Sequence, residues 1–574
     1  MSMVNVTING TKHQLEAGMT VLEACRKIGV DIPTLCHLKN LAPSGSCRIC
    51  VVEVEKARTL VPSCAFPIAE GMVVRTNTER IRQARKMIIE LLLANHPSDC
   101  LNCNRSLSCE LQKLAMEYEA EHKPYMKAKR HHAIDASSPS LIRNPDKCII
   151  CGRCVRVCEE VQGVGAIDFT KRGFESIVLP AFNDELADTT CVNCGQCIKV
   201  CPTGALSENF SVKDVIDALN TKDKVVVCQI APAVRVALGE MFNVDEDNVA
   251  PLLVDALHRI GFKHVFDTNF AADLTIMEEG TELVTRLTTG GVLPMITSCS
   301  PGWIKFIEHF YPQMLPNLST CKSPQQMQGA VIKSYWAKKM NIDPKNIFNV
   351  SIMPCTAKKF EAQRPEMEVD GIRDVDVVLT TREVGKLLRA FDVELKSCNK
   401  VEFDNPLGES SGAGAIFGAT GGVMEAALRT GYMLVTGKEL EKIDIEAVRG
   451  FEGVKEATVQ VGDIPVSIAI ASGLANARKL LDMVISGQKK YHFIEIMACP
   501  GGCLNGGGQP TTFDVDALRK RLAKIYAIDK NSKIRRSHEN ESIKTLYAEF
   551  LQKPNSPVSH KYLHTHYHAR PEKC

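Results

Sequence analysis

Two short stretches, CIICGRCVRVC at residues 148–158 and CVNCGQCIKVCP at residues 191–202, decide how the middle of this chain folds. Each has the spacing C-x2-C-x2-C-x3-C, which binds two [4Fe–4S] clusters when it occurs twice. In that arrangement the fourth cysteine of each run binds the other cluster. The repeat therefore predicts two clusters, one on Cys148, Cys151, Cys154 and Cys201 and one on Cys158, Cys191, Cys194 and Cys197.

A different set of metal ligands lies just before this repeat. His96-x3-Cys100-x2-Cys103-x5-Cys109 follows an amphipathic stretch at residues 81–93. One imidazole and three thiolates suit a structural zinc as well as a [4Fe–4S] cluster. The neighbouring cluster motifs favour iron, and zinc remains the alternative.

The N-terminal segment predicts a third kind of site. Residues 4–10 alternate and end in Asn-Gly, a hairpin signal, and residues 20–28 indicate a short helix. Cys36, Cys47, Cys50 and Cys64 follow with the spacing C-x10-C-x2-C-x13-C. Four thiolates in a small β-rich domain of β-grasp appearance favour [2Fe–2S], with zinc again the alternative.

Composition limits the remaining possibilities. The chain has 574 residues, 24 cysteines and a formal net charge of +2, with 45% hydrophobic and 24% charged residues. Such values are typical of a multidomain globular protein and give no electrostatic argument for nucleic-acid binding. Apolar stretches such as 87–94 are too short to span a bilayer, and no export signal is apparent, so we expect a cytoplasmic protein without a membrane segment.

The second half of the chain has another character. Residues 224–230, 264–267, 346–352 and 375–380 indicate buried strands, and residues 249–260, 273–287 and 381–390 indicate helices. Strands that alternate with helices predict α/β architecture with parallel strands. Three cysteine-bearing segments, TSCSPGW at 297–303, MPCTAKKFE at 353–361 and EIMACPGGCLNGGGQP at 495–510, suggest one site built from loops on that sheet.

These three segments resemble the signature segments of iron-only ([FeFe]) hydrogenases, and the resemblance extends over nearly the whole chain. It implies an H-cluster, which is a [4Fe–4S] cubane joined by a cysteine thiolate to a two-iron unit with CO, cyanide and a dithiolate. Cys355, Cys499 and Cys503 match cubane ligands, and Cys503 matches the bridging thiolate. Lys358 matches a lysine that hydrogen-bonds a cyanide. Other positions match residues that line the pocket, with core packing as the alternative role for the large side chains: Ala231, Pro232, Gln325, Met353, Phe417 and Met497.

The resemblance also implies a proton route toward Cys299, through Glu279, Ser319, Glu282 and Arg286. Glu279 and Glu282 are three residues apart and Arg286 follows four later, so all three share one helical face. Without the resemblance, this pattern predicts a solvated charged face.

One position departs from the family pattern. The first signature normally has two adjacent cysteines, a proton-relay thiol and then a cubane ligand, but this chain has Cys299-Ser300. Because Pro301 resists a backbone shift, we expect Cys299 to keep the relay place and Ser300 to keep the ligand place. Serine oxygen is a poorer ligand for iron–sulfur sites than thiolate, so we expect a more labile cubane.

The expected organisation has five units. Residues 1–78 form a β-grasp [2Fe–2S] domain, 79–125 a His-ligated [4Fe–4S] domain, 126–208 a two-cluster ferredoxin domain, 209–510 the α/β H-cluster domain, and 511–574 a wrapping tail that resembles a small subunit. The histidines near residues 564–568 are expected to be packed or solvated, although alternate histidines also suit a metal. Cys25, Cys228, Cys321, Cys398 and Cys574 are expected to be ordinary thiols.

Together these features predict a hydrogenase that interconverts protons, electrons and H₂, with one [2Fe–2S] and three [4Fe–4S] clusters as the electron chain. No nucleotide-binding motif is present, so NAD(P) chemistry would belong to partner flavoprotein or iron–sulfur subunits, with ferredoxin as the other electron partner. Maturation proteins would supply the two-iron unit. The alternatives are an H₂-sensing family member and a non-catalytic electron-transfer subunit.

Overall fold

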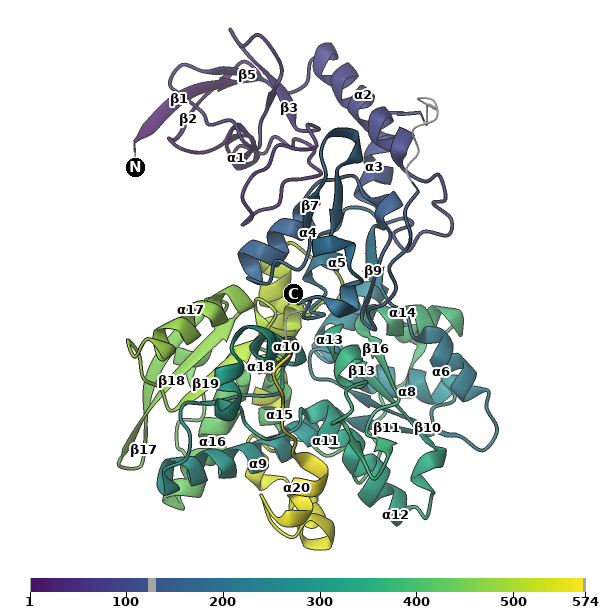
Figure 1. Ribbon diagram of the computed structural model, residues 1–574, viewed down its shortest axis with the longest axis vertical. Helices are drawn as coiled ribbons and strands as arrows, with labels where there is room; N and C mark the ends of the chain where they lie inside the picture. The colour runs from purple at the N-terminus through teal and green to yellow at the C-terminus, as the bar shows by residue number, and fades with distance from the viewer. Residues whose placement is uncertain (1, 122–130, 571–574) are drawn as a thin grey trace.

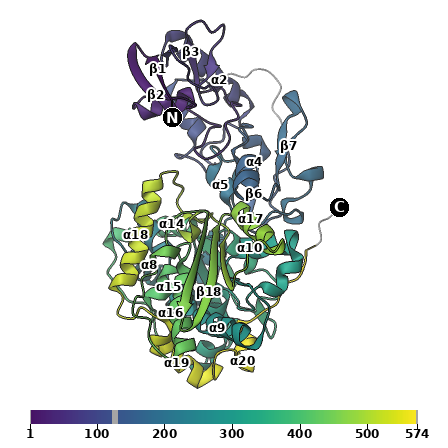
Figure 2. The same ribbon diagram turned by 90° about the vertical axis from the view of Figure 1, so that its left-hand side faces the viewer.

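The computed structural model describes residues 2–121 and 131–570. A narrower part made from the N-terminal third of the chain stands on a broader body made from the rest (Figures 1 and 2). The boundary expected at residues 125 and 126 lies outside the described residues, as does Cys574.

The first part of the chain forms a five-stranded sheet in the order β2-β1-β5-β3-β4. The predicted hairpin is present as β1 (Met3–Ile8) and β2 (Thr11–Glu16), and the predicted helix is α1 (Val21–Lys27), whose N-terminus is capped by Thr20. The other strands are β3 (Val51–Val54), β4 (Val61–Pro62) and β5 (Val73–Arg75). The sheet and α1 enclose a small apolar core that includes Cys25, Cys50 and Cys64.

Two helices connect this sheet to the repeat region. They are α2 (Glu79–Asn95), which contains the predicted amphipathic stretch, and α3 (Glu110–Glu117). The repeat region has two short helices, α4 (Arg153–Arg156) and α5 (Gln196–Val200), which occupy equivalent places after the second cysteine of each run. Each begins after a glycine with positive φ, Gly152 at 67° and Gly195 at 70°, a conformation that glycine adopts without strain. The strands here pair antiparallel as β6 (Leu141–Arg143) with β9 (Leu206–Glu208) and β7 (Asp168–Thr170) with β8 (Ile177–Leu179).

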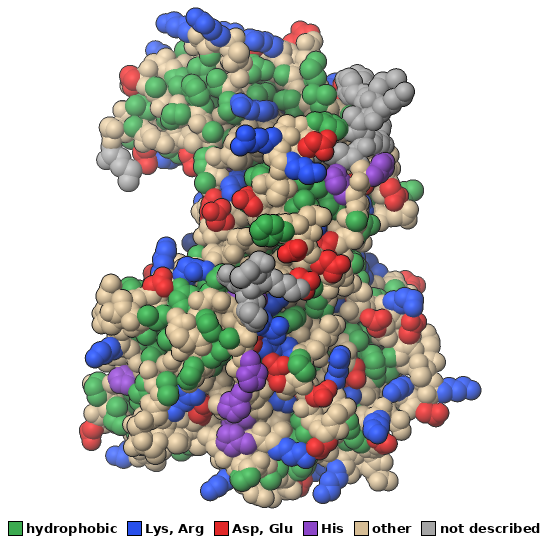
Figure 3. Space-filling view, viewed as in Figure 1, with side chains coloured by type: hydrophobic (Ala, Val, Ile, Leu, Met, Phe, Trp, Pro, Cys, Tyr) green, Lys and Arg blue, Asp and Glu red, His purple; other side chains and the backbone are tan. Residues whose placement is uncertain are grey.

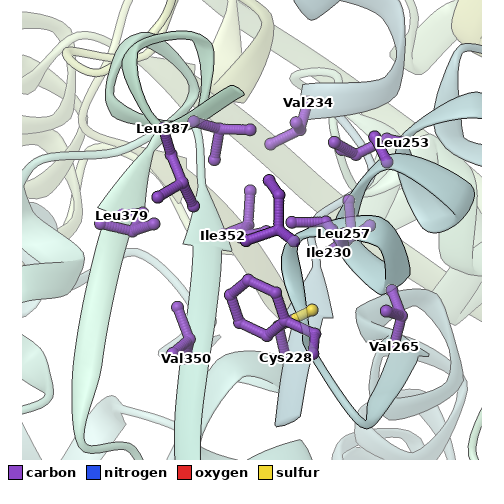
Figure 4. Close-up of a cluster of buried hydrophobic side chains, with 14 of the residues drawn as sticks. Cys228, Ile230, Val234, Leu253, Leu257, Val265, Val350, Ile352, Leu379 and Leu387 are labelled. Carbon is purple, nitrogen blue, oxygen red and sulfur yellow. The ribbon is translucent and has the colours of Figure 1, made fainter. Parts of the chain in front are cut away.

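The broad body contains two four-stranded sheets that stand side by side in Figure 1. The first has the order β11-β10-β13-β16 and is entirely parallel, as the sequence predicts. Its strands are β10 (Val225–Ile230), β11 (His264–Asp267), β13 (Ile347–Met353) and β16 (Val377–Thr380). Figure 4 shows the apolar core on this sheet, where Ile230 and Ile352 lie among Leu253, Leu257 and Leu387.

The second sheet, in the order β12-β19-β18-β17, differs from the expectation of parallel strands alone. Its strands are β12 (Met295–Ile296), β17 (Val454–Val461), β18 (Ile464–Ser472) and β19 (Phe493–Met497). β17 and β18 form an antiparallel hairpin, which faces the viewer in Figure 2. We did not predict this hairpin, because β17 is only half buried and its alternating polar residues do not form an apolar run.

Helices cover both sheets. The predicted helices are found as α8 (Ala250–Ile260), α9 (Thr268–Thr289) and α14 (Thr381–Ala390), and α9 starts earlier than expected because the Asp267 side chain caps its N-terminus. The others in the body are α6 (Val212–Leu219), α7 (Val234–Ala237), α10 (Pro301–Phe310), α11 (Pro324–Val331), α12 (Ala337–Lys339), α13 (Ala357–Glu361), α15 (Gly412–Ile416), α16 (Gly422–Thr436) and α17 (Leu474–Ile485). A short hairpin, β14 (Glu368–Val369) with β15 (Ile372–Arg373), completes the body.

The C-terminal segment lies along the outside of the body. α18 (Val515–Asn531) packs on α15, and α19 (Glu541–Leu546) and α20 (Pro557–Leu563) lie at the bottom of the body in Figure 1. The chain then runs upward and pairs with residues 320–322 through an antiparallel bridge between Cys321 and His564. Among the described residues, no helix is long and apolar enough to cross a membrane.

Candidate active site and cluster sites

The repeat places its eight cysteines in two groups, in the interleaved way that the spacing predicts. Cys148, Cys151 and Cys154 line one cavity together with Cys201, the last cysteine of the second run. Cys158, the last cysteine of the first run, lies near Cys191, Cys194 and Cys197, and their charges raise one another's pKa. Burial is the largest cause of these raised pKa values. A bound metal reverses this effect, because it holds coordinating thiols as thiolates.

The four cysteines of the N-terminal sheet domain also converge. The Cys36 side chain hydrogen-bonds those of Cys47 and Cys64, and Cys64 also bonds Cys50. All four are buried. Buried thiols in mutual contact fit a cluster that uses all four as ligands.

The third group is more open. Cys100, Cys103 and Cys109 lie close enough for the first two to raise the pKa of Cys109, although its burial contributes more. Cys100 is exposed. His96 directly follows the last residue of α2, at the end of the helix from which the chain continues to these cysteines.

Arginine side chains join these sites to one another. Arg156 donates to the carbonyl of Cys36 at 2.6 Å and to that of Cys151 at 3.2 Å, so it connects the [2Fe–2S] candidate with the first repeat site. Arg105 donates to the carbonyl of Cys201, and a Cβ on Gly204 would lie 2.7 Å from the Cys103 sulfur. Both N-terminal sites therefore lie against the group formed by residues 148, 151, 154 and 201.

The candidate catalytic site is a cavity where several strands of the two sheets end. β10 leads into Ala231 and Pro232, β12 into the segment at 297–303, β13 into the segment at 353–361 and β19 into the segment at 495–510. β10 runs parallel to β13 in the first sheet, and β12 runs parallel to β19 in the second. Residues that follow all four strands line the same cavity, so the carboxyl ends of the two parallel pairs face it. Crevices at the carboxyl ends of parallel strands are the usual ligand sites of α/β proteins.

The cavity brings together the twelve residues that the sequence resemblance assigned to the H-cluster and its pocket. Its space open to the centres of water molecules is about 80 Å³. A single water needs only about 10–15 Å³ of such space, so the cavity admits a much larger group. Its lining includes Ala231, Pro232, Cys299, Ser300, Gln325, Met353, Cys355, Lys358, Phe417, Met497, Cys499 and Cys503. Phe417 and Met497 also belong to the core between α16 and β18, so these two side chains both pack in the core and line the cavity.

The donor set of the cavity fits an iron–sulfur cofactor. Burial raises the pKa of Cys355, Cys499 and Cys503, and for Cys503 the value is about 12. The surrounding wall is apolar apart from a few polar groups. Among the described residues, only two lysines act on these thiols electrostatically: Lys358 on Cys355 and Cys503, and Lys199 on Cys499. Three thiols that face one apolar cavity are a donor set that soft metal ions prefer.

Lys358 has a protein partner that we did not predict. Its ammonium donates to the Glu361 carboxylate at 2.9 Å, to the Ser323 hydroxyl at 2.7 Å and to the Cys299 carbonyl at 3.2 Å. We expected its charge to be balanced by a cyanide ligand, whereas the buried Glu361 already balances it. The signal was available, because Glu361 is three residues after Lys358 in α13.

Ser300 and Cys299 both line the cavity. Ser300 precedes Pro301 at the start of α10, and its Oγ accepts a hydrogen bond from the Ala498 N–H at 3.2 Å. Its side chain therefore faces the segment that carries Cys499. The division of roles between Cys299 and Ser300 stays a prediction.

The repeat region touches this cavity directly. Cys194 is one of the residues that line it, and the Cys499 charge contributes to the raised pKa of the Cys194 thiol. Thr356, next to Cys355, donates to the Asn193 carbonyl at 2.8 Å, and Lys199 donates to the Asn505 carbonyl at 2.9 Å. The second repeat site is thus adjacent to the catalytic cavity, with no domain between them.

The proposed relay residues form a connected and buried series. Glu279 and Glu282 have exposed fractions of only 2% and 9%, so the alternative prediction of a solvated charged face is wrong. Ser319 hydrogen-bonds Glu279 and also donates to Glu282 at 3.1 Å. Arg286 donates to Glu282 at 2.6 Å and to the Leu318 carbonyl.

Glu279 is the relay carboxyl group whose charge acts on the Cys299 thiol at the cavity wall. Burial, and to a lesser degree the charge of Glu282, raise its pKa to about 8. Burial also raises the pKa of the Cys299 thiol, and the Glu279 charge adds to that rise. The Glu279 Oε2 atom is buried and has no hydrogen-bond partner among the described residues. A carboxyl group with this pKa exchanges protons near neutral pH.

The C-terminal segment adds residues to this region that we assigned no role. His564 is buried, with Nδ1 at 2.8 Å from Thr320 Oγ1 and Nε2 at 3.1 Å from Glu278 Oε2. Tyr547 donates to Glu278 at 2.7 Å. The tail is therefore packed against the relay helix at this point. Sequence spacing could not show it, because the contact joins residues more than 240 positions apart.

Fold and site define a multidomain iron–sulfur oxidoreductase, and comparisons with known families agree. Residues 224–507 match the iron only hydrogenase large subunit, C-terminal domain, and residues 515–570 match the iron hydrogenase small subunit. Residues 1–79 match a 2Fe-2S iron-sulfur cluster binding domain. Residues 85–124 match the NADH-ubiquinone oxidoreductase-G iron-sulfur binding region, and residues 147–205 match a 4Fe-4S dicluster domain.

Relatives extend this likeness over the full length. The NADP-reducing hydrogenase subunit HndD of Solidesulfovibrio fructosivorans is 50% identical and aligns over 99% of this chain and 100% of its own. Iron hydrogenase 1 of Clostridium pasteurianum is 42% identical and aligns over 98% of this chain and 100% of its own. A variant of apo [FeFe]-hydrogenase HydA1 from Chlamydomonas reinhardtii has a solved structure with a TM-score of 0.57 and 43% identity, covering 62% of this chain and 98% of that one. The chain belongs to the iron-only hydrogenase family.

Proposed function

We propose that this protein is the catalytic subunit of an NAD(P)-linked [FeFe] hydrogenase, with its active centre in the cavity that Cys355, Cys499 and Cys503 line. Those three thiols would hold the cubane, and Cys503 would carry the two-iron unit. When bound, the H-cluster supplies the iron chemistry that interconverts protons, electrons and H₂. The single observation that carries this proposal is the meeting of all three signature segments at one cavity.

The side chains around the cavity have separate tasks. Lys358, held by Glu361 and Ser323, presents a fixed positive charge to anionic ligands of the cofactor. Ala231, Pro232, Met353, Phe417 and Met497 exclude water with apolar surface, and Gln325 offers an amide at the same wall. Cys299, Glu279, Ser319, Glu282 and Arg286 would pass protons between this wall and the surface.

Electrons would reach the cavity through the cluster held by Cys158, Cys191, Cys194 and Cys197, because Cys194 itself lines the cavity. The cluster of Cys148, Cys151, Cys154 and Cys201 comes next. The remaining two, one [2Fe–2S] on Cys36, Cys47, Cys50 and Cys64 and one [4Fe–4S] on His96, Cys100, Cys103 and Cys109, would receive electrons from partners.

The name of the Solidesulfovibrio relative, an NADP-reducing subunit, supports an NAD(P)-linked partner. This chain has no nucleotide-binding motif, so the nicotinamide chemistry would take place on a partner flavoprotein or iron–sulfur subunit. Ferredoxin is the other candidate donor. Nicotinamide pools and reduced cysteines are both typical of the cytoplasm, where we place the protein.

Infrared spectroscopy tests the central proposal. The matured protein should show bands of iron-bound CO and cyanide, and it should evolve H₂ from a reduced dye. Cys503→Ser should lose both properties and keep the signals of the other iron–sulfur clusters. A matured protein that retains its clusters but shows no such bands would instead be an electron-transfer subunit. Bands without turnover would favour an H₂ sensor.

A further inference from the structure

One buried lysine lies between the second repeat site and the cavity. Figure 3 shows where lysine and arginine side chains usually lie, spread over the surface among acidic ones. Lys199 is only 3% exposed and belongs to α5, the short helix of the second cysteine run. A buried charge is stable only with a partner of opposite sign. The neighbours of Lys199 therefore indicate which negative group balances its charge.

The ammonium of Lys199 contacts the third signature segment. It donates to the Asn505 carbonyl at 2.9 Å and also to the side-chain oxygen of the same residue. Asn505 in turn donates to the Pro500 carbonyl at 3.1 Å, within the turn that carries the two cysteines of this segment. Gln196, three residues before Lys199 on the same face of α5, donates to the Asn505 carbonyl at 3.3 Å. Two polar side chains of α5 thus hold the turn that carries two proposed cubane ligands.

No carboxylate accepts a hydrogen bond from Lys199 among the described residues. Three other buried lysines each pair with a carboxylate: Lys322 with Asp374, Lys358 with Glu361 and Lys359 with Glu383. Burial lowers the pKa of Lys199 most, the charge of Cys499 acts in the opposite direction, and the charges of Arg521 and Arg382 also lower it. The negative partner of Lys199 therefore lies on the side of Cys499.

A cluster held by thiolates would supply that negative charge. Burial raises the pKa of the Cys499 thiol, and Lys199 is the largest influence in the opposite direction, followed by a hydrogen bond from the Gln196 side chain. The reduction potential of an iron–sulfur cluster depends on its net charge, its burial and the hydrogen bonds to its sulfurs. A positive charge and a hydrogen bond at Cys499 both favour the state with one more electron.

We propose that Lys199 is a positioning residue that raises the reduction potential of the cluster on Cys355, Cys499 and Cys503 and so favours electron movement from the second repeat site into the cavity. The inference rests on the proposed function, in which both sites hold clusters. In this step the cluster of the second repeat site loses one electron and the cavity cluster gains it. Lys199 keeps its proton and its contacts with Asn505 throughout.

Potentiometric titration of the holoenzyme tests this role. Electron paramagnetic resonance and the infrared bands of CO report the reduction of the cavity cluster as the potential is lowered. Lys199→Gln removes the charge and keeps an N–H donor for Asn505. We expect its cavity cluster to be at least tenfold harder to reduce, which is a midpoint about 59 mV more negative for a one-electron couple. In a partly reduced sample, the electron should then stay on the second repeat site.

Three further variants separate the charge of Lys199 from its structural role. Lys199→Arg keeps the charge, so its midpoint should stay closer to that of the unaltered protein than to that of Lys199→Gln. Asn505→Ala keeps the ammonium and removes one of its acceptors, and it should shift the midpoint less than Lys199→Gln does. Lys222→Gln, the same change at an exposed position, should leave the midpoint unchanged.

The outcomes distinguish this inference from the proposed function. An unchanged midpoint in Lys199→Gln with full iron content would overturn the inference. Loss of cavity iron from Lys199→Gln, or an equal shift in Lys199→Arg or Asn505→Ala, would overturn it too, because each assigns Lys199 a structural role alone. Unaltered protein without CO and cyanide bands would overturn the proposed function instead, and the shift would then be measured on the paramagnetic signal of the cubane.

Discussion

Ser300 and Ala498 join two signature segments of the cavity: the Ala498 N–H donates to Ser300 Oγ at 3.2 Å. The bond aligns the start of α10 with the loop that carries Cys499. It also occupies one lone pair of the only oxygen donor among the four proposed cubane ligands, so the hydroxyl is held at the cavity wall. Ser300 is therefore well placed but chemically weak as a ligand.

Ser300→Cys should raise the iron content of the cavity cluster, because a thiolate binds iron more firmly than a hydroxyl does. Iron analysis and Mössbauer spectroscopy after matched reconstitution would measure the gain. Ser300→Ala is the control, and it should hold less iron than the unaltered protein. Equal iron content in all three proteins would show that position 300 does not contact the cubane.

Glu279→Gln and Glu282→Gln should each lower turnover by orders of magnitude. An amide keeps the size and most hydrogen bonds of the carboxylate but cannot carry a proton. Turnover with artificial dyes, together with iron content and infrared spectra, would separate lost proton delivery from lost cofactor. The matched control is Glu441→Gln, an exposed position that should retain full turnover. Near-normal rates in both relay variants would mean that these carboxylates serve structure alone.

The raised pKa of Glu279 predicts how catalysis responds to pH. The group is mostly protonated below pH 8 and ionised above it. H₂ oxidation requires the ionised form to accept a proton, so its rate should rise through pH 8, while H₂ evolution should fall. A carboxylic-acid band in infrared difference spectra should titrate in the same range and vanish in Glu279→Gln. A band that is already lost at pH 6 would contradict this assignment.

The raised pKa of Glu279 also makes the stability of the folded protein depend on pH. Between pH 4.5 and about 8 the folded protein holds a proton on Glu279 that the unfolded chain releases. The contribution of this group is thus fully present below pH 4.5 and is lost as the pH rises through 8. Glu279→Gln should lose less stability over that range, measured by thermal unfolding under anaerobic conditions. A steeper loss in the variant would refute the raised pKa.

His96→Ala should disturb one [4Fe–4S] signal in electron paramagnetic resonance and leave the others unchanged. The reason is that the remaining three cysteines cannot complete the ligand set of that cluster. His37→Ala offers a matched control, since His37 lies next to a cysteine of a different group. Zinc found at the His96 site, or an unchanged spectrum, would show that no iron–sulfur cluster uses this imidazole.

Much of this molecule could be predicted from local patterns. The spacing of the 148–158 and 191–202 runs predicts two interleaved groups of cysteines, and the structure brings Cys201 to the first group and Cys158 to the second. The binding of clusters by these eight cysteines stays a prediction. The parallel sheet and α8, α9 and α14 followed from buried apolar runs. The signature segments were found to share one cavity, as loops at strand ends should.

The features that escaped prediction depend on distant contacts. The hairpin of β17 and β18 lacks a continuous apolar run, since it is partly exposed. The burial of Glu279 and Glu282 depends on the packing of α9 between α11 and α16, which no helical periodicity shows. His564 reaches the relay only because the tail pairs with residues 320–322. In each case the deciding neighbour is far away in sequence.

The contacts of Arg156 also affect how electrons from different donors reach the cavity. Its guanidinium ties the Cys36 site to the Cys151 site, and Arg105 ties the Cys103 region to the same group through Cys201. If both N-terminal sites hold clusters as proposed, electrons from either site would pass through the cluster of Cys148, Cys151, Cys154 and Cys201 before they reach the cavity. Such a junction makes donors compete: while an electron from one waits there, the other input is blocked. The rate of H₂ evolution with two electron donors supplied together should then be lower than the sum of the rates with each donor alone. The cluster of Cys148, Cys151, Cys154 and Cys201 would set that limit.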